Sequence, residues 1–350
     1  MIPEVLLPAA TGFAVSVVAT GAVNVVARRR GLLDRPDPSR RTHAVPTPRL
    51  GGVGIALGAL AGVVCLVVTA RARDLASDAF LALGAGAGGF FAVGLLDDLA
   101  PRGVGLAARV KLLLLAAVAT LAVMLGARFD GTAAGSWPAL DLGPSTAPLT
   151  VLWFLAVANV VNFMDGIDAI TATTAAVILA AAAGSGGACE PVEAAAAGAV
   201  VGFLVWNAPE AKIFMGDGGA YLLGFLVAAS PCRFGDSGTP AGAPWPLVGA
   251  ALVPSIVDVV EALIHKRRAG IPLSQPHHDH LYQRLVKAGH PPALVALRYG
   301  ALALAAIAVA GPVADRLGAL PATAIGLAVL AAHLALGRRS TRAVPRLEAS

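Results

Sequence analysis

Carboxylates recur at the ends of long apolar runs in this 350-residue chain. They are Asp97 with Asp98, Asp165 with Asp168, Glu210, Asp217, and Asp258 with Glu261. Carboxylates are costly next to lipid, so acids kept at such positions indicate function. Their repeated placement at helix ends predicts one shared site for a metal ion and a polyanion.

Asp97 and Asp98 directly follow the apolar run 79–96. Adjacent residues on a helix point about 100° apart. One carboxylate could therefore face a metal or a phosphate while the other takes a proton. The alternative is an ordinary pair of solvated acids at a helix end.

A second polar segment runs from Asn162 to Asp168 between two apolar runs. Asp165 and Asp168 are three positions apart, so they would share one face of a helix. Gly166 between them allows close approach of the backbone. Three polar groups in so short a connection indicate a site, and the alternative is that Asp165 or Asp168 caps a helix.

Asn207 and Asp217 lie between the next two apolar runs, with Lys212 between them. Asp217 stands between Gly216 and Gly218 at the expected start of a helix, where a bound ion can approach closely. Backbone amides at a helix start also favour phosphate. The alternative is a glycine-rich turn with a capping aspartate.

A polar stripe on the run 245–264 combines Asp258 and Glu261 with His265 just beyond its end. In a membrane helix this stripe must face protein or water. Asp258 lies about 9 Å from the cytoplasmic end at helical rise. It is therefore expected to support a neighbouring basic side chain rather than to touch a substrate.

The segment 276–285 contains His277, His278 and His280 beside Arg284. Imidazoles and a guanidinium over a carboxylate-bound metal suit a pyrophosphate. Two alternatives stay open, a merely polar loop and transition-metal ligation.

The composition indicates that membrane-spanning helices position these groups. The chain is 57% hydrophobic and 13% charged, with a mean hydropathy of +0.76, which excludes a soluble domain of this size. We expect an all-α, polytopic membrane protein of about 11 transmembrane helices, with residues 1–337 as one domain and 338–350 as a basic, disordered tail. The expected spans are 5–27, 50–70, 79–96, 106–126, 147–163, 168–184, 193–207, 218–230, 245–264, 295–313 and 319–337.

The basic residues predict the orientation. On one side of an eleven-span arrangement lie only Arg71, Arg73, Arg128, Arg233 and Arg316, and the rest of the 26 Lys and Arg residues fall on the other side or at its helix ends. Basic residues stay with the cytoplasm. We therefore expect an external N-terminus, a cytoplasmic C-terminus and an active site on the cytoplasmic face of the cell membrane.

The net charge of +5 does not indicate a nucleic-acid partner, because the basic residues are spread over several loops without interleaved aromatics. Topology explains most of them, and Arg40, Arg41 and Arg49 are candidates for substrate phosphate. The three cysteines lack metal-site spacing. Cys189 and Cys232 fall in expected external loops, which leaves a disulfide between them open.

Taken together, these motifs resemble the polyprenyl-phosphate N-acetylhexosamine-1-phosphate transferases of glycosyl transferase family 4, which include phospho-N-acetylmuramoyl-pentapeptide transferase. The resemblance covers nearly the whole chain, with several motifs in the family's order. It rests on 33–36, 46–52, Asp97 with Asp98, 162–168, Asn207 with 214–217, Asp258, and 277–284.

The resemblance implies transfer of a sugar 1-phosphate from a UDP-activated amino sugar to undecaprenyl phosphate, with release of UMP, in synthesis of a cell-envelope polysaccharide. The implied cofactor is Mg²⁺, or Mn²⁺ in its place. The expected partners are the two substrates, the lipid bilayer and a second copy of the chain, without nucleic acid.

The resemblance also implies roles for individual residues. Asp217 and Asp165 are expected at the metal, and Asp97, Asp98 and Asp165 in catalysis. Substrate binding is expected from Asn162, Asn207, His277, His280, Arg284 and Arg49.

One departure concerns the histidines. Many family members carry a His-x-His-His run where this chain has His280-Leu281-Tyr282-Gln283, preceded by His277. This pattern resembles the branch that primes O-antigen or related surface polysaccharides, and it argues against a muramoyl-pentapeptide donor. Which imidazole meets the pyrophosphate, that of His277 or of His280, stays open.

The reaction requires attack by one anion on another, so their repulsion has to be screened. Mg²⁺ with Asp217 and Asp165 would do this, and Asp97 or Asp98 would act as general base. Transfer in one step and transfer through a carboxylate-bound phosphosugar stay open. The rival functions are a membrane prenyltransferase with aspartate-rich metal motifs and a secondary transporter, although transporters place their binding groups near the midplane.

Overall fold

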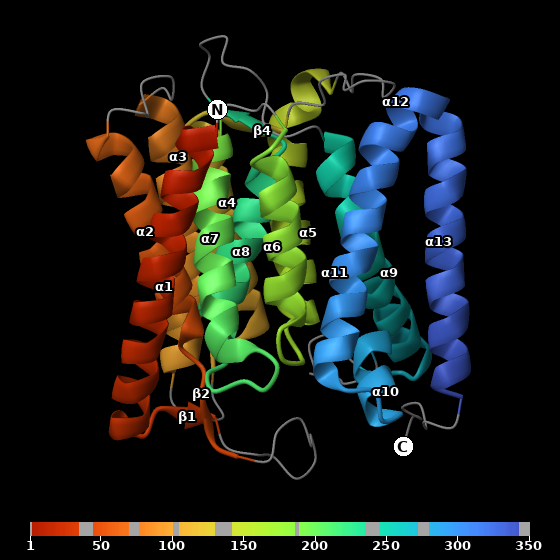
Figure 1. Ribbon diagram of the computed structural model, residues 1–350, viewed down its shortest axis with the longest axis horizontal. Helices are drawn as coiled ribbons and strands as arrows, with labels where there is room; N and C mark the ends of the chain where they lie inside the picture. Colours follow the sequence, from red (N-terminus) through yellow and green to blue (C-terminus); the bar gives the residue numbers. More distant parts are fainter. Residues whose placement is uncertain are drawn as a thin grey trace.

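The protein is a bundle of helices that run roughly parallel to one another (Figure 1). The computed structural model describes residues 2–34, 45–69, 77–100, 105–129, 142–185, 189–234, 245–271 and 280–342. The described α-helices are α1 (Ile2–Arg30), α2 (Gly51–Val68), α3 (Ser77–Leu99), α4 (Ala108–Met124), α5 (Thr146–Met164), α6 (Ile170–Ala182), α7 (Glu190–Asn207), α8 (Gly216–Ala229), α9 (Trp245–Arg268), α10 (Leu281–Lys287), α11 (Pro292–Ala308), α12 (Ala314–Leu317) and α13 (Ala319–Ser340). A 3₁₀ turn (Gly143–Ser145) precedes α5, and a π-helical turn (Val309–Val313) joins α11 to α12.

The predicted all-α, polytopic membrane fold is confirmed. A helix covers most of each of the eleven expected spans, and α10 and α12 are short additions. Within the described residues, seven helices are long and apolar enough to cross a bilayer, while α6 and α8 are shorter apolar helices. The start of α1 and the end of α13 lie at opposite ends of the bundle (Figure 1).

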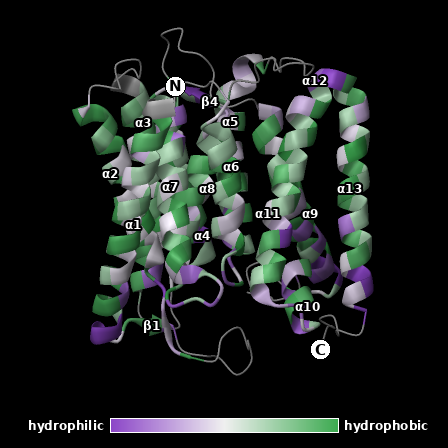
Figure 2. Ribbon diagram, viewed as in Figure 1, coloured by the Kyte–Doolittle hydropathy of each residue, from purple (hydrophilic) through white to green (hydrophobic). Residues whose placement is uncertain are grey.

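The outer surface of the bundle suits lipid. Large apolar side chains such as those of Leu113, Met124 and Leu320 are exposed along it, and hydrophilic residues gather toward the two ends (Figure 2). Exposed apolar surface on this scale is unfavourable in water. The protein is therefore a multi-pass membrane protein.

Helix α8 forms the centre of the core. After its first turn every residue is buried, as expected for a helix that is apolar on all sides. The ring of Phe225 stacks on Phe90 of α3 and Phe154 of α5, with centroids 5.1 and 4.9 Å apart. These contacts hold α8 between α3 and α5.

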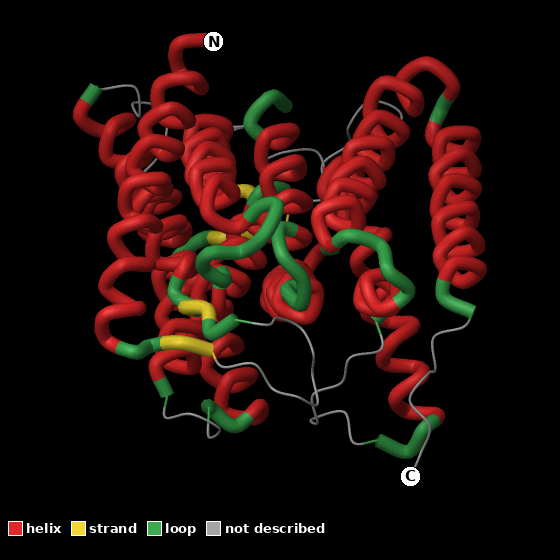
Figure 3. Tube along the Cα trace, turned by 60° about the horizontal axis from the view of Figure 1, so that its bottom comes forward, coloured by secondary structure: helices red, strands yellow, loops and turns green. Residues whose placement is uncertain are grey.

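Two short antiparallel strand pairs lie at opposite ends of the bundle. Strand β1 (Leu33–Asp34) pairs with β2 (Thr47–Pro48) in antiparallel register, and β3 (Ala127–Phe129) pairs with β4 (Cys232–Phe234). Figure 3 brings the end that carries β1 and β2 forward, where several loops meet. This end holds the candidate site described below.

The chain after β2 is tied to the chain before α8. The Phe214 amide donates to the Pro48 carbonyl at 2.7 Å, and the amides of Gly51 and Gly52 donate to the carbonyls of Phe214 and Met215 at 2.9 and 2.8 Å. A side chain on Gly52 would collide with the backbone of Gly219. Glycine is therefore needed for α2 and α8 to approach this closely.

The structure also describes the start of the C-terminal tail and two of the cysteines. The basic tail begins within helix, because α13 continues to Ser340, so its first residues are not disordered. Cys189 and Cys232 are both buried and are not joined by a disulfide.

Candidate active site

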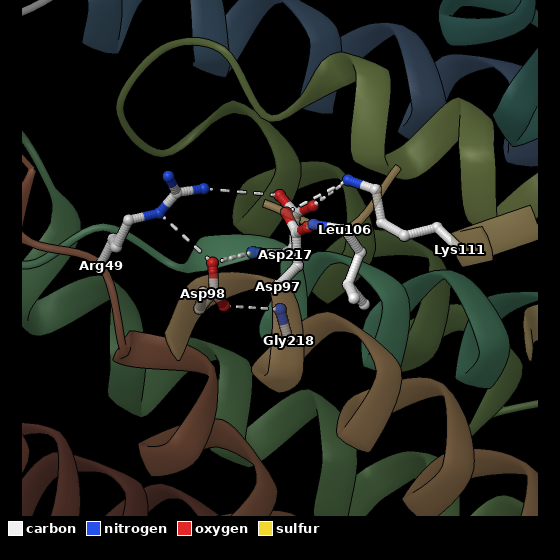
Figure 4. A network of polar contacts seen from close by, with 7 residues as sticks. All are labelled: Arg49, Asp97, Asp98, Leu106, Lys111, Asp217 and Gly218. Atoms are coloured by element: carbon white, nitrogen blue, oxygen red, sulfur yellow. Dashed lines mark hydrogen bonds and ion pairs between the residues drawn. The ribbon is translucent and has the colours of Figure 1, made fainter. Parts of the chain in front are cut away.

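One end of the bundle holds a compact group of charged side chains (Figure 4). Three carboxylates, Asp97, Asp98 and Asp217, which we call the carboxylate cluster, contact two cations, Arg49 and Lys111. These residues come from the turn before α2, the end of α3, the first turn of α4 and the start of α8. Three carboxylates thus share two basic side chains, which leaves room at the site for a further cation.

Asp98 is the buried member of the carboxylate cluster, with 1% of its side chain exposed. Its Oδ1 accepts from the Asp217 amide at 3.0 Å, and its Oδ2 accepts from the Gly218 amide at 2.8 Å. The Arg49 Nε lies 3.3 Å from Oδ1. The expectation that the first amides of α8 are available to phosphate is therefore wrong for these two groups, because Asp98 occupies them.

Lys111 joins the other two carboxylates. Its Nζ lies 3.2 Å from Asp97 Oδ2 and 3.0 Å from Asp217 Oδ2. The Asp97 Oδ1 also accepts from the Leu106 amide at 2.6 Å. The side chains of Asp97 and Asp217 are 12% and 18% exposed, so they are more open to a ligand than Asp98. The adjacent Asp97 and Asp98 thus face different partners, as their separation around the helix predicts.

Lys111 was absent from the candidates taken from the sequence. A cation inside the apolar run 106–126 is costly in a membrane unless it is paired, and this signal could have identified it. Its partners lie 14 and 106 residues away along the chain. Only packing of α3, α4 and α8 reveals that pairing.

Arg49 is half exposed beside the carboxylate cluster. Its Nη2 lies 3.6 Å from Asp217 Oδ1. Burial opposes its charge, but the carboxylates of Asp98 and Asp217 outweigh this effect and raise the pKa of Arg49. Arg49 is therefore a permanent cation whose fork of N–H donors could also hold a phosphate.

The loop between α5 and α6, residues 165–169, carries Asp165, and we call it the Asp165 loop. The expected shared helical face of Asp165 and Asp168 is wrong, because both residues lie in the loop outside the two helices. Capping of a helix by either side chain is also not observed, since Ala169 occupies the N-cap position of α6. Ala169 has a left-handed backbone (φ 66°), which costs about 1 to 2 kcal/mol in a residue with a Cβ.

Asp165 lies within electrostatic reach of the carboxylate cluster. Burial is the main reason that the pKa of Asp165 is raised to about 7. The Thr171 hydroxyl opposes this shift, while the charges of Asp217 and Asp98 add to it. The charges of Asp217 and Asp98 thus act on Asp165, and its predicted place at a shared metal stays a prediction.

Asn207 and Asp168 tie the Asp165 loop to the loop before α8. Asn207 Oδ1 accepts from the Ala169 amide at 2.8 Å, and its Nδ2 donates to the Ile213 carbonyl at 2.9 Å. Asp168 Oδ2 accepts from the Ala211 amide at 3.0 Å. These bonds offset the strain at Ala169, and Asn207 occupies a linking position in addition to its predicted substrate role.

The other residues predicted for the site are Asn162, His280, Arg284 and His277. Asn162 is half-buried in the last turn of α5, and its carbonyl accepts from the Asp165 amide at 3.2 Å. His280 lies with Nδ1 3.3 Å from Asp258 Oδ1, and Arg284 donates from Nη2 to Thr341 Oγ1 at 2.7 Å. His277, like Arg40 and Arg41, lies outside the described residues. The roles of these residues stay predictions.

The donors at the site fit a Mg²⁺ ion that is shared with phosphate. Mg²⁺ usually takes one or two carboxylates and fills its other positions with water and phosphate oxygens. Asp217 is partly exposed, and its charge acts on Asp165. In the part of the chain that the structure describes, no three His, Cys, Asp or Glu side chains are grouped to hold a metal alone. Asp217 could therefore provide one carboxylate to an ion whose other positions are filled by water and phosphate.

Comparison with known proteins connects this geometry to a family. The model of glycosyl transferase family 4 matches residues 80–234, a segment that contains Asp97, Asp98, Lys111, Asp165 and Asp217.

Three relatives illustrate the range of similar proteins. A probable undecaprenyl-phosphate N-acetylglucosaminyl 1-phosphate transferase of Bacillus subtilis is 29% identical, over 83% of this chain and 80% of its own length. The decaprenyl-phosphate N-acetylglucosaminephosphotransferase of Mycobacterium tuberculosis is 29% identical, over 82% and 77%. The phospho-N-acetylmuramoyl-pentapeptide-transferase of Frankia casuarinae is 34% identical, over 64% of this chain and 74% of its own length.

Proposed function

Because the chain belongs to glycosyl transferase family 4, we propose that it transfers an N-acetylhexosamine 1-phosphate, or a related amino-sugar 1-phosphate, from a UDP-sugar to undecaprenyl phosphate. The observation that carries this proposal is the meeting of Asp97, Asp98 and Asp217 with Arg49 and Lys111 at one end of a membrane bundle. Such a site can receive two phosphorylated substrates, one from the lipid and one from water.

In the proposed reaction, an oxygen of the lipid phosphate attacks the sugar-bearing phosphorus of the donor. A new P–O–P bond forms, the bond between that phosphorus and the bridging oxygen breaks, and UMP leaves. Both reactants are anions, so positive charge at the site has to bring them together. Arg49 and Lys111 provide part of that charge.

A bound Mg²⁺ would screen the phosphates and stabilise the leaving UMP. We assign its protein ligands to Asp217 and Asp165, with Mn²⁺ as a substitute ion. Because Arg49 and Lys111 both contact Asp217, they keep its carboxylate in one orientation before any ligand arrives. This preorganisation reduces the cost of binding.

The two adjacent acids receive different roles. Asp98 holds the start of α8 through the Asp217 and Gly218 amides, which makes it a positioning residue. Asp97 is the more exposed of the pair, so we assign it the general-base role toward any proton on the lipid phosphate. A phosphate monoester has a pKa near 6, so at neutral pH this proton is often already absent and the contribution of the base is modest.

The direct test is release of UMP by the purified protein from a panel of UDP-sugars, with and without undecaprenyl phosphate. The panel includes UDP-N-acetylglucosamine, UDP-N-acetylgalactosamine and UDP-N-acetylmuramoyl-pentapeptide. We expect lipid-dependent release with an N-acetylhexosamine donor and none with the pentapeptide donor, because Tyr282 and Gln283 stand where that branch carries histidines. Release that does not require the lipid would refute the proposed acceptor.

Two observations would favour the rival functions. Consumption of a prenyl diphosphate without UMP release would indicate a prenyltransferase, and uptake of a solute into proteoliposomes would indicate a transporter.

Labelling of an engineered cysteine beside Arg49 from one side of intact cells would test the proposed cytoplasmic face of the cell membrane. Priming of a surface polysaccharide is proposed from the same histidine pattern.

A further inference from the structure

Asp258 on α9 is a buried carboxylate outside the cluster of Figure 4, with 1% of its side chain exposed. Its Oδ1 accepts from the Leu281 amide at 2.8 Å and lies 3.3 Å from His280 Nδ1. Its Oδ2 accepts from the Tyr282 amide at 3.2 Å and from the Tyr299 hydroxyl. Asp258 thus connects α9 to the start of α10 and to α11.

The position of α10 depends on such contacts. This helix has seven residues, and an isolated helix of that length is unstable in water. Asp258 satisfies two backbone amides at its start, which no partner inside a helix can satisfy. The Asp258 carboxylate therefore holds the N-terminus of α10 in place.

Helix α10 in turn lies against the chain that carries Asp165. The Tyr282 hydroxyl donates to the Phe163 carbonyl at 3.0 Å. A side chain on Gly166 would collide with the Tyr282 hydroxyl and approach Gln283 Nε2. Any shift of α10 would therefore change the space around Asp165.

We propose that Asp258 is a positioning residue that fixes the start of α10 and, through Tyr282, the Asp165 loop. The inference rests on the proposed function for its kinetic consequences, but its structural part does not. An asparagine at this position would present an NH₂ group in place of one carboxylate oxygen. Either the Leu281 or the Tyr282 amide would then face the NH₂ group and lose its acceptor, so the start of α10 would be held less firmly.

Three variants test this proposal kinetically. Asp258→Asn should lower kcat about 10- to 100-fold, since displacement of a catalytic group by about 1 Å can have effects of this size. Tyr282→Phe removes only the hydroxyl that reaches Phe163 and should lower kcat about 3- to 10-fold. Tyr299→Phe is the matched control, because it removes a donor to Asp258 but keeps the ring and both amide bonds from α10 to Asp258, and it should change kcat less than about twofold.

Non-additivity separates positioning from a general loss of stability. The double variant Asp258→Asn with Tyr282→Phe should be no more than about twofold slower than Asp258→Asn alone, because both changes break one connection. Trp153→Phe removes a hydrogen bond from α5 to the Ala228 carbonyl far from α10, and its effect should multiply with that of Asp258→Asn. Full multiplication in the first pair as well would overturn the proposal.

Amide hydrogen exchange gives a readout that does not depend on activity. Exchange in residues 163–169 should be about tenfold faster in Asp258→Asn and Tyr282→Phe than in the unchanged protein, and unaltered in Tyr299→Phe. Unchanged exchange in Tyr282→Phe overturns the inference even if Asp258→Asn does not fold. If the unchanged protein releases no UMP, the proposed function fails, and the exchange experiment still decides the role of Asp258.

Discussion

Lys111→Met should tighten binding of a divalent cation while it slows transfer. In the structure the Lys111 Nζ lies 3.0 Å from Asp217 Oδ2, and a metal bound by this carboxylate has to compete with that contact. A hydrogen bond between charged groups contributes about 1.5 to 3 kcal/mol. Lys111 and Asp217 are 20% and 18% exposed, so we take the lower end of this range. Removing the contact should therefore tighten Mn²⁺ binding by about tenfold.

The assay is a Mn²⁺ titration followed by electron paramagnetic resonance, with UMP release measured on the same samples. Arg109→Met is the matched control, because it removes the same charge from an exposed position two residues earlier in α4. We expect weaker transfer in Lys111→Met, because a cation that faces the substrate phosphates is lost. Equal Mn²⁺ affinity in Lys111→Met and the unchanged protein would refute the competition at Asp217. Equally tighter binding in Lys111→Met and Arg109→Met would show that the overall charge, not the contact with Asp217, controls the affinity.

Three further predictions follow from the same site. Asp217→Asn should abolish nearly all activity in membranes at normal expression, and EDTA should do the same to the unchanged protein until Mg²⁺ is restored; near-normal turnover of the variant at saturating Mg²⁺ would remove Asp217 from the metal site. Asp98→Asn should lower UMP release at least tenfold and also lower the thermal midpoint, because its NH₂ group would face either the Asp217 or the Gly218 amide, which then loses its acceptor; an unchanged midpoint would contradict its positioning role. Gly216→Ala should destabilise the protein by at least about 1 kcal/mol in thermal unfolding, since φ is +77° there and the new methyl would meet the Arg49 carbonyl oxygen; a stability equal to that of Gly218→Ala, where φ is ordinary, would contradict this.

The predicted pyrophosphate contact of the histidine segment stays a prediction, because the structure shows its described residues in contact with other side chains. His280 and Arg284 were predicted from their chemistry. The structure places His280 at the N-cap of α10, in contact with Asp258, and Arg284 within α10, in contact with Thr341. A histidine held by a carboxylate keeps one ring orientation. The proposed contact of His280 with a pyrophosphate therefore requires α10 to stay fixed, which the Asp258 variants test.

Much of this protein could be predicted from local sequence. Apolar runs of about 20 residues can cross a membrane only as helices, because every backbone amide must be paired within the segment. The acids at the ends of these runs were identified for the same reason, since lipid does not tolerate them without a partner. These properties depend on neighbouring residues, so the local sequence alone predicts Asp97, Asp98, Asp165 and Asp217 as candidate site residues.

The partners of those acids required the tertiary structure. Asp98 binds amides 119 and 120 residues further along the chain, and Lys111 pairs with an acid 106 residues away. Likewise Ala169 breaks the helix expected through Asp165 and Asp168, and Asn207 stabilises that break from another helix. Such contacts arise only when α3, α4, α5, α7 and α8 pack together. The sequence by itself thus determines which chemical groups are present. Helix packing, which no local pattern encodes, decides which groups contact one another. It therefore also decides that Asp98 is a positioning residue while Asp97 and Asp217 remain more open to a ligand.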